Sequence, residues 1–398
     1  MSHFTYLIAG GGMTADAAVR GIREVDPDGS IGLIGSEPDP PYKRPPLSKK
    51  LWQGKPFESV WLGTADRGVG LHLGRTVRTL DLRAKQAVDD RGDVYGFDKL
   101  LLATGVTPRR LPFGGHRIIY FRTLDDYRRL RSLTEHGRRF AVVGGGFVGS
   151  EIAAALATNG KEVAMIFPEE AIGARLFPSD LAGSLTERYR TEGVEVIPGA
   201  AVTDVAERGD QLAVTLGTAE GAAGRELVVD GIVAGIGTRP NVELAEAAGL
   251  ATADGIVVDP YLRTSHPDVH AAGDVARFCQ PALGELVRVE HEDNAKRMGR
   301  AAGRAMAGDP APYDHLPYFY SDLFDLGYEA VGEVDARLDT VADWAEPYRR
   351  GVVYFVRDAR VRGVLLWNVW DRTDDARELV GSAQRFRAPE LIGRIAIE

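Results

Sequence analysis

A glycine-rich pattern occurs twice in the chain, and it restricts the possible folds more than any other feature of the sequence. The first copy spans residues 6–15, with Gly10, Gly12 and Ala15 at its small-residue positions, and the second spans residues 140–149. In each copy a short apolar run predicts a buried parallel strand. The helix that follows offers backbone N–H groups and the positive end of its dipole to a phosphate. Two copies therefore predict two bound dinucleotides.

Each small residue of the pattern has its own physical role. The first glycine allows a tight turn, the second removes the side chain that would block a pyrophosphate, and the third small residue lets the helix pack close to the strand. A single match is often only an ordinary strand-to-helix turn. Here a second β-like run follows each copy and ends in a carboxylate suited to a ribose, namely Glu37 in the first unit and Glu169 with Glu170 in the second.

The size and composition of the chain favour a multi-domain enzyme. Its 398 residues suggest two or three domains, and 44% apolar with 26% charged residues is typical of a soluble globular protein. No apolar run is long enough for a membrane span. The net charge of -9 argues against nucleic acid as a partner. Because the first strand follows Met1 almost directly, we expect no targeting segment and a cytoplasmic location.

The single cysteine limits the redox chemistry. Cys279 has no partner for an internal disulfide, so the dithiol relay of many two-dinucleotide flavoenzymes is absent. Electrons must reach their acceptor without a protein cysteine pair. We expect Cys279 to be a small packed residue rather than a nucleophile.

Residues 1–112 form the expected first nucleotide domain. After Glu37 a proline-rich segment prevents a helix from starting before about Leu47. This segment is either a surface loop with solvated cations, or a rigid loop that directs Arg44 to the phosphates and Lys49 to the ring of a flavin. Further expected elements are a strand at 74–82, a hairpin at 88–97 and a closing strand at 99–105.

Residues 113–238 form the expected second nucleotide domain. Thr123 is a candidate helix cap, a helix is expected from Asp180 to Glu192, and a strand at 194–197 precedes a meander through 202–227. The closing run at 232–241 repeats the turn at 103–108. Residues 239–316 then return to the first domain. There Asp274 either accepts hydrogen bonds from a ribityl chain or caps a helix, and an acidic first turn begins a helix that lasts to about Ala307.

Residues 317–398 are expected to form a small α+β domain. Strands are predicted at 328–333, 351–356 and 361–367, followed by a helix from about Asp374. This domain is too short to be the catalytic core, but its aromatic residues could form one wall of a site.

With these motifs identified, the chain resembles the FAD-dependent pyridine-nucleotide oxidoreductases, in the branch of apoptosis-inducing factor and the ferredoxin reductases. The resemblance rests on residues 42–49, 144–151, 167–169, 272–274, 289–291, 321–322, 328–329 and 366–368. It implies an α/β fold with two Rossmann-like domains of the glutathione-reductase type, for FAD and NAD, and a C-terminal α+β domain.

The resemblance also implies the cofactor contacts. For FAD it implies Gly10, Gly12, Met13, Thr14, Ala15, Glu37, Arg44, Lys49, Val77, Ala103, Thr104, Arg122, Asp274 and His291, and Tyr320 is expected to stack near either the nicotinamide or the flavin. For NADH it implies Gly145, Gly146, Phe147, Val148, Glu169, Arg175, Gly237, Glu290, Glu329 and Asn368. No metal site is implied.

The resemblance further implies that three residues act at the redox centre. Lys49 and Glu151 would pair beside flavin N5, closing that side of the site and orienting it. Tyr320 stands where the family usually has Trp before Ser-Asp. Its smaller ring puts the affinity for cofactor and the lifetime of a charge-transfer complex in question.

The expected function is hydride transfer from NADH to flavin, followed by electron transfer to a separate acceptor. Glu169 should repel the 2′-phosphate of NADPH, although Arg175 could accommodate it. A ferredoxin would need a basic rim, for which the candidates are Lys43, Lys50, Arg128, Arg129, Arg131, Arg138 and Arg139. A quinone or oxygen acceptor would need none. The alternative is a redox-sensing interaction protein with slow turnover, and the chain is expected to be a monomer or homodimer.

Overall fold

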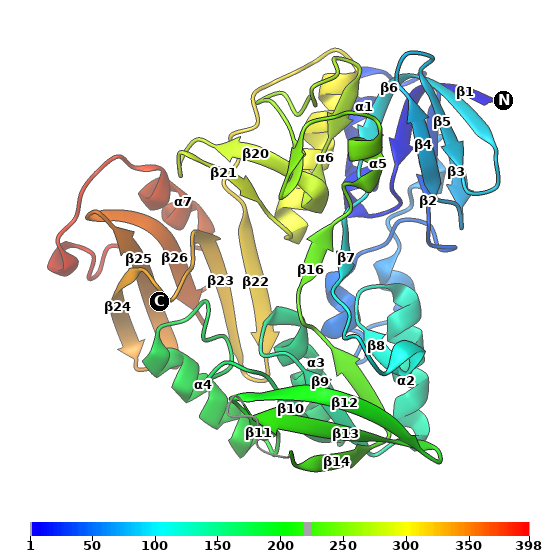
Figure 1. Cartoon of the computed structure of the whole chain (residues 1–398). Helices are drawn as coiled ribbons and strands as arrows, with labels where there is room; N and C mark the ends of the chain where they lie inside the picture. Colours follow the sequence, from blue (N-terminus) through cyan, green and yellow to red (C-terminus); the bar gives the residue numbers. More distant parts are fainter. Residues whose placement is uncertain (1, 219–223, 398) are drawn as a thin grey trace. The chain divides into compact units, whose positions relative to one another are not determined.

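The computed structural model describes residues 2–218 and 224–397, and Figure 1 labels their helices and strands. The chain divides into two compact units. Unit 1 comprises residues up to Lys43, Phe57–Thr107 and Arg239–Phe319, and unit 2 comprises Arg44–Pro56, Pro108–Thr238 and the chain from Tyr320 onward. Each unit is described by itself below.

Unit 1 is built on a mixed sheet in the order β3-β2-β1-β6-β5-β4, with β19 also paired to β6. The parallel strands are β1 (Ser2–Ala9), β2 (Ile31–Gly35), β3 (Val69–Leu73), β6 (Val94–Leu102) and β19 (Val269–Ala271). Strands β4 (Val77–Asp81) and β5 (Gln86–Asp89) extend the sheet in antiparallel fashion. Strand β2 is an apolar run that is buried at every position, so both faces of the sheet are covered there.

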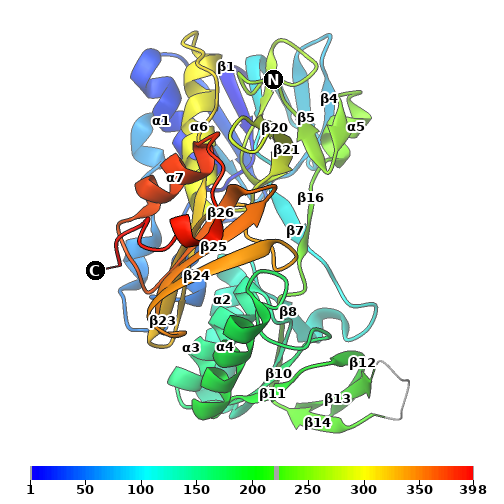
Figure 2. The same ribbon diagram turned by 90° about the vertical axis from the view of Figure 1, so that its left-hand side faces the viewer.

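Helices α1 (Met13–Val25) and α6 (Glu292–Met306) lie side by side in unit 1 (Figures 1 and 2). Glycines make this close approach possible. A Cβ atom built on Gly21 would lie 2.1 Å from the carbonyl oxygen of Arg300, and one on Gly303 would lie 2.1 Å from that of Ala18. Any side chain at these positions would push the two helices apart.

The rest of unit 1 consists of short elements. A four-stranded sheet has the order β17-β18-β20-β21, and the short helix α5 directly precedes it in the chain. Their bounds are β17 (Thr252–Ala253), β18 (Gly255–Val257), β20 (Ala276–Gln280), β21 (Glu285–Arg288) and α5 (Glu243–Ala247). Cys279 lies on β20 and is exposed, so the expectation of a packed cysteine is wrong. Strand alternation turns Phe278 and Gln280 inward and leaves Cys279 on the outer face.

Unit 2 repeats the nucleotide-binding plan with a parallel sheet in the order β11-β10-β9-β15-β8. Its strands are β8 (Ile118–Tyr120), β9 (Arg139–Val143), β10 (Glu162–Ile166), β11 (Glu195–Ile197) and β15 (Gly231–Ala234), and its helices are α2 (Leu124–His136), α3 (Phe147–Thr158) and α4 (Ser179–Thr191). An antiparallel meander of β12 (Ala200–Arg208), β13 (Gln211–Thr218) and β14 (Glu226–Val229) follows α4 and β11. The short strands β7 (Val106–Pro108) and β16 (Thr238–Pro240) pair with each other.

The C-terminal part of unit 2 is a five-stranded sheet in the order β22-β23-β26-β25-β24, with α7 packed against β23 and β26. The bounds are β22 (Tyr318–Leu323), β23 (Leu326–Gly332), β24 (Asp339–Glu346), β25 (Arg350–Arg357), β26 (Arg360–Trp367) and α7 (Thr373–Gly381). The sequence predicts β23, β25 and β26 but misses β22 and β24. Strand β24 is a largely exposed edge strand, so its sequence lacks the apolar alternation of a half-buried strand.

Most local predictions are confirmed. The hairpin forms around Arg91-Gly92-Asp93, the meander is present, and Thr123 caps α2 in a full capping box with Asp126. Two predictions are wrong. The 3₁₀ helix η1 (Pro45–Ser48) begins before Leu47, because proline is tolerated in a first helical turn, and the closing strand at 99–105 is the second half of the longer β6. The three-domain division stays a prediction, since the two compact units do not follow its boundaries one for one.

No helix in residues 2–218 and 224–397 is both long enough and apolar enough to cross a membrane.

Candidate active site

The glycine turn of unit 1 has the geometry that a dinucleotide phosphate requires. Gly10 has a φ of 140°, and a Cβ there would lie 2.1 Å from the carbonyl oxygen of Ala103. At Gly12 a Cβ would meet no described atom within 4 Å, so the space beside this backbone is open. Ala15 is fully buried, and α1 begins at Met13 with no side-chain cap among the described residues. The N-terminus of α1 is therefore directed at open space, as phosphate binding requires.

The glycine turn of unit 2 repeats this geometry position by position. Gly144 has a φ of 115°, and its Cβ would lie 2.4 Å from the carbonyl oxygen of Gly235. Gly146 faces open space among the described residues, and a Cβ on Gly149 would lie 2.0 Å from the carbonyl oxygen of Gly144. The two copies thus share the crowded first glycine and the open second glycine. A group as large as a pyrophosphate can approach the backbone at both.

The carboxylates expected at the two riboses lie just beyond β2 and β10. Glu37 accepts a hydrogen bond from the Tyr42 hydroxyl at 2.6 Å. Glu169 forms an ion pair with Arg175 at 2.5 Å, while the Arg175 side chain is 82% exposed. Arg175 is therefore held by the same carboxylate that should exclude a 2′-phosphate.

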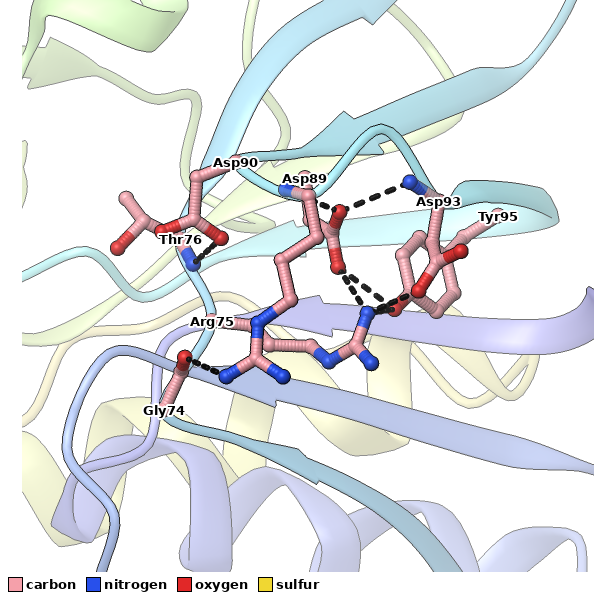
Figure 3. A network of polar contacts seen from close by, with 8 residues as sticks. Gly74, Arg75, Thr76, Asp89, Asp90, Asp93 and Tyr95 are labelled. Atoms are coloured by element: carbon pink, nitrogen blue, oxygen red, sulfur yellow. Dashed lines mark hydrogen bonds and ion pairs between the residues drawn. The ribbon is translucent and has the colours of Figure 1, made fainter.

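A polar network joins the loop at 74–76 to the hairpin residues Asp89, Asp90 and Asp93 and to Tyr95 in unit 1, as Figure 3 shows. The backbone N–H groups of Gly74 and Arg75 donate to the carbonyl oxygens of Glu37 and Gly35. The Arg75 guanidinium in turn donates to Asp89 at 2.7 Å. This loop ends at Val77, so the network holds the two segments expected at the adenosine end of FAD against each other.

Asp89 is the buried centre of this network. Its carboxylate also accepts hydrogen bonds from the Tyr95 hydroxyl at 2.9 Å and from the backbone N–H groups of Arg91 and Asp93 at 2.9 Å each. Burial alone would raise the pKa of Asp89, but these donors and Arg75 hold it well below its usual value. Asp89 therefore stays ionised and keeps Arg75 in place.

The closing turn of unit 1 is fixed by an asparagine. Asn241 donates to the carbonyl oxygen of Thr104 at 2.8 Å, and the Thr104 hydroxyl donates to the carbonyl oxygen of Asn241 at 2.8 Å. Gly237 holds the corresponding turn in unit 2 with a φ of 92°. Both closing turns lie at the carboxyl end of the strand that backs the glycine pattern, where ligands bind in open α/β sheets.

Asp274 lies in a short 3₁₀ helix that packs onto the start of α1. A Cβ on Gly273 would lie 2.2 Å from the Thr14 hydroxyl oxygen, so only glycine fits there. The N-cap of this 3₁₀ helix is Ala272, so Asp274 does not act as its cap. Arg288 holds this region by donating to the carbonyl oxygen of Asp274 at 3.1 Å and to Glu290 at 2.5 Å.

His291 is the N-cap residue of α6 and stacks on Phe319. The ring centroids are 4.4 Å apart with an interplanar angle of 17°. Burial lowers the pKa of His291 to about 4, so the imidazole is neutral at pH 7. A neutral ring beside the positive end of a helix can donate one hydrogen bond without adding charge.

Lys49 and Glu151 form a buried ion pair in unit 2, as expected from the sequence. The Lys49 ammonium lies 2.6 Å from Glu151 Oε1, and the two side chains are 7% and 6% exposed. The interpretation of Lys49 as a solvated surface cation is therefore wrong. The ammonium also lies 5.1 Å from the centre of the Tyr320 ring. These three residues are brought together although they are far apart in the sequence.

Two serines complete the surroundings of Glu151. The hydroxyls of Ser48 and Ser321 donate to Glu151 Oε2 and Oε1 at 2.6 Å each. Sequence reasoning gave neither serine a role, although both lie in motifs that it identified, 42–49 and 321–322. Tyr328 and Tyr189 lie nearby. Burial, and secondly the charge of Glu151, raise the pKa of both phenols well above the usual value.

Three further residues expected to contact a cofactor lie in unit 2. Arg44 and Asn368 are hydrogen-bonded to backbone groups, and Glu329 is partly buried. Arg44 donates to the carbonyl oxygen of Arg122 at 2.8 Å. Asn368 holds two segments together, by accepting from the Gly327 N–H at 2.7 Å and by donating to the Arg349 carbonyl oxygen at 2.9 Å. Glu329 Oε2 is buried and has no hydrogen-bond partner in the described part of the chain. Burial, with a contribution from the charge of Asp371, raises the pKa of Glu329.

A pocket in unit 2 adjoins the second glycine turn. Its polar edge is formed by Gly145, Gly146, Phe147 and Ser150, and its apolar wall includes Phe177 and other residues. The other residues that line it are Ile172, Gly173, Leu176, Leu185, Leu323 and Tyr328. Its volume of about 10 Å³ admits no more than a water molecule, so this pocket by itself does not hold a dinucleotide. Among the described residues, no group of three or more His, Cys, Asp or Glu side chains gathers where it could hold a metal ion.

Comparison with known proteins identifies the family. The family model described as pyridine nucleotide-disulphide oxidoreductase matches residues 4–299. The chain belongs to this family. A second model, the C-terminal domain of mitochondrion-associated apoptosis-inducing factor, matches residues 302–347 and 345–382. The family resemblance and the fold class inferred from the sequence are thereby confirmed.

Similar members of the family include both types expected. Apoptosis-inducing factor 1 of Dictyostelium discoideum is 34% identical, over 96% of this chain and 79% of its own length. The ferredoxin–NAD(+) reductase component of the 3-phenylpropionate/cinnamic acid dioxygenase of Photorhabdus laumondii is 34% identical, over 84% and 86%. The crystal structure of the covalent putidaredoxin reductase–putidaredoxin complex matches with a TM-score of 0.89 at 28% identity, over 99% of this chain and 96% of that chain.

As a member of this family the protein is an oxidoreductase that uses FAD and a pyridine nucleotide. The residues present fit both groups, because each glycine turn leaves open the space that a Cβ at Gly12 or Gly146 would fill. With a single cysteine in the whole sequence, it does not carry the disulphide relay that the family name describes.

Proposed function

We propose that the protein is an NADH-dependent reductase that passes electrons through FAD to a small iron–sulfur protein of the ferredoxin type. The observation that carries this proposal is the buried ion pair between Lys49 and Glu151, a residue on the helix of the second glycine turn, in a chain without a cysteine pair. Two similar proteins whose names specify reduction of such a partner support it.

In this proposal the glycine turn and ribose carboxylate of unit 1 bind FAD, and those of unit 2 bind NADH. Gly10, Gly12 and the N-terminus of α1 take the FAD pyrophosphate, while Glu37 takes the ribose. Gly146 and Glu169 do the same for NADH. The bound flavin supplies the redox chemistry, and the chain supplies placement and electrostatics.

Lys49, Glu151 and Tyr320 are proposed to act beside the reacting rings. Lys49 contributes a positive charge that favours electron-rich flavin, and Glu151 fixes the direction in which that charge points. The Tyr320 ring, which lies against the Lys49 ammonium, supplies an aromatic surface for a ring to stack on.

The proposal is tested by the absorbance spectrum of the purified protein before and after anaerobic NADH. We expect a flavin spectrum that is bleached by NADH. A colourless protein that cannot be reconstituted with FAD would contradict the proposal. If NADH bleached the flavin and the reduced protein then reduced a quinone or oxygen rapidly but no ferredoxin, the acceptor would be a quinone or oxygen instead of a ferredoxin.

Replacing Glu169 by Gln is expected to raise kcat/KM for NADPH about 10- to 100-fold. The substitution removes the charge that repels a 2′-phosphate and releases Arg175 to bind it. Steady-state kinetics with NADH and NADPH measure the effect. Glu170→Gln is the matched control, because Glu170 is an exposed neighbour of the same charge. An equal change in both variants would exclude Glu169 as the specificity determinant.

A basic cluster in unit 2 is proposed as the docking surface for the acceptor. It consists of Lys50, Arg128, Arg129 and Arg131, all exposed on segment 44–56 and α2. Arg131 connects the two elements, since its guanidinium lies 4.8 Å from the centre of the Trp52 ring. The other arginines that the sequence suggested are ion-paired, Arg138 with Glu162 and Arg139 with Glu195. Steering of an acidic partner therefore rests on the cluster.

Reversing the charge of Arg128 and Arg131 to Glu should raise KM for ferredoxin about tenfold or more at low ionic strength. The same variant should reduce ferricyanide with NADH at the rate of the wild type, because this assay needs no protein partner. Arg138→Glu is the control, since its charge is already paired with Glu162. If ferredoxin-linked cytochrome reduction were unchanged in the double variant, this docking surface would be excluded.

A slow redox sensor is the competing proposal. It predicts a long-lived reduced form with a changed mass, whereas the enzyme predicts fast turnover at constant mass. Stopped-flow reduction followed by light scattering distinguishes them, and it also reports whether the protein is a monomer or a homodimer.

A further inference from the structure

Glu151 receives more polar contacts than an ion pair requires. One oxygen of its carboxylate contacts Lys49 and Ser321, and the other contacts Ser48, all at 2.6 Å. The Ser321 side chain is fully buried, and Glu151 is 6% exposed. A buried carboxylate needs donors on both oxygens, and here two separate segments of unit 2 supply them, Ser48–Lys49 and Ser321.

The positions of the two serines in the sequence give this arrangement a consequence. Ser48 directly precedes Lys49, at the end of η1, and Ser321 directly follows Tyr320, in β22. Glu151 therefore holds each of these two residues through the hydroxyl of its neighbour in the chain, and it holds Lys49 a second time through the ammonium. The result is a fixed separation of 5.1 Å between the Lys49 ammonium and the Tyr320 ring.

We infer that Ser48 and Ser321 are positioning residues that set the placement of the Lys49 charge and the Tyr320 ring through Glu151. This inference rests on the proposed function, in which that charge and that ring lie beside the reacting cofactors. No direct contact between either serine and a cofactor is proposed. Each acts by fixing the carboxylate that orients its neighbour.

The arrangement predicts different effects for the two serines. Without the Ser48 hydroxyl, Glu151 Oε2 loses its donor, the carboxylate can rotate, and the Lys49 ammonium loses its fixed direction. Without the Ser321 hydroxyl, β22 loses its link to Glu151, and the Tyr320 ring loses its fixed position. Ser48 should therefore affect the flavin potential most, and Ser321 should affect ring stacking most.

The test uses the full-length, FAD-loaded protein with Ser48→Ala, Ser48→Thr and Ser321→Ala. For Ser48→Ala we expect a three- to tenfold smaller equilibrium constant for two-electron flavin reduction. This change corresponds to a midpoint potential about 14 to 30 mV more negative. The potential is measured by anaerobic titration with dithionite and a reference dye, which does not involve NADH. Ser48→Thr keeps the hydroxyl and should restore the wild-type potential.

For Ser321→Ala we expect a loss of at least half of the long-wavelength absorbance that appears when NADH reduces the protein, with a smaller change in potential. Thr134→Val is the matched control for both alanine variants. Thr134 is a buried residue on α2 whose hydroxyl donates to the carbonyl oxygen of Arg131, so its loss affects stability without reaching Glu151.

The outcomes separate this inference from the proposed function. If both alanine variants match Thr134→Val in potential and absorbance, the serines are only structural and the inference is wrong. If NADH does not reduce the wild-type protein, the proposed function fails, while the dithionite titration still decides the role of Ser48. A wild-type protein that takes up no FAD would overturn both.

Discussion

Replacing Lys49 by Met is expected to lower the free energy of unfolding by about 3–5 kcal/mol, which is the cost of leaving one charge of a buried pair without its partner. Glu151 would keep its two serine donors but lose the cation. The rate of flavin reduction by NADH should fall at least tenfold, because the positive charge proposed beside the reacting rings is removed. Urea denaturation and anaerobic stopped-flow absorbance measure the two effects.

A double variant separates the charge from the packing. Lys49→Met with Glu151→Leu removes both charges, so it should regain most of the lost stability while the rate stays low. Recovery of the rate together with the stability would show that the pair has only a structural role. A wild-type rate in Lys49→Met alone would exclude Lys49 from the redox centre.

Replacing Gly146 by Ala should raise KM for NADH about 10- to 100-fold without a change in thermal stability. The new methyl group would meet no described atom of the protein, since φ at Gly146 is -90° and the space beside it is open. It would meet the pyrophosphate that this position is proposed to admit, at a cost of about 1–3 kcal/mol. Steady-state kinetics and thermal denaturation of the FAD-loaded protein measure the two quantities.

Gly144 is the contrasting position in the same turn. Its φ of 115° and the 2.4 Å approach to the Gly235 carbonyl oxygen make any Cβ a strain on the backbone itself. Gly144→Ala should therefore lower both stability and NADH affinity. If Gly146→Ala destabilised the protein as strongly as Gly144→Ala, or left KM unchanged, the open space would not be the pyrophosphate site.

The parts of the site that the sequence predicted are those encoded over short distances. The spacing of Gly10, Gly12 and Ala15 predicts a strand, a turn and a helix start, because backbone sterics decide these within about ten residues. The helix cap at Thr123 was predicted for the same reason, and the structure adds the reciprocal bond from Asp126 that makes it a capping box. Edge strand β24 was missed because it is largely exposed and lacks the alternation that burial imposes.

The surroundings of Glu151 could not be predicted in this way. Ser48 and Ser321 lie 103 and 170 residues from it in the sequence, and a serine has no pattern that marks it as a donor to a distant carboxylate. The network around Asp89 was missed for a similar reason. Its Arg75 and Tyr95 are ordinary polar residues in a hairpin region until the strands pair.

The sequence by itself determined that this chain has two dinucleotide-binding turns and no cysteine pair, because both properties depend only on which residues occupy nearby positions. The tertiary structure decided which side chains surround the buried Lys49–Glu151 pair, and it showed that Arg175 is held by Glu169 and that Cys279 is exposed. Those facts depend on the packing of segments far apart in the chain. The burial of each charge, and so the donors it needs, is set only when those segments come together.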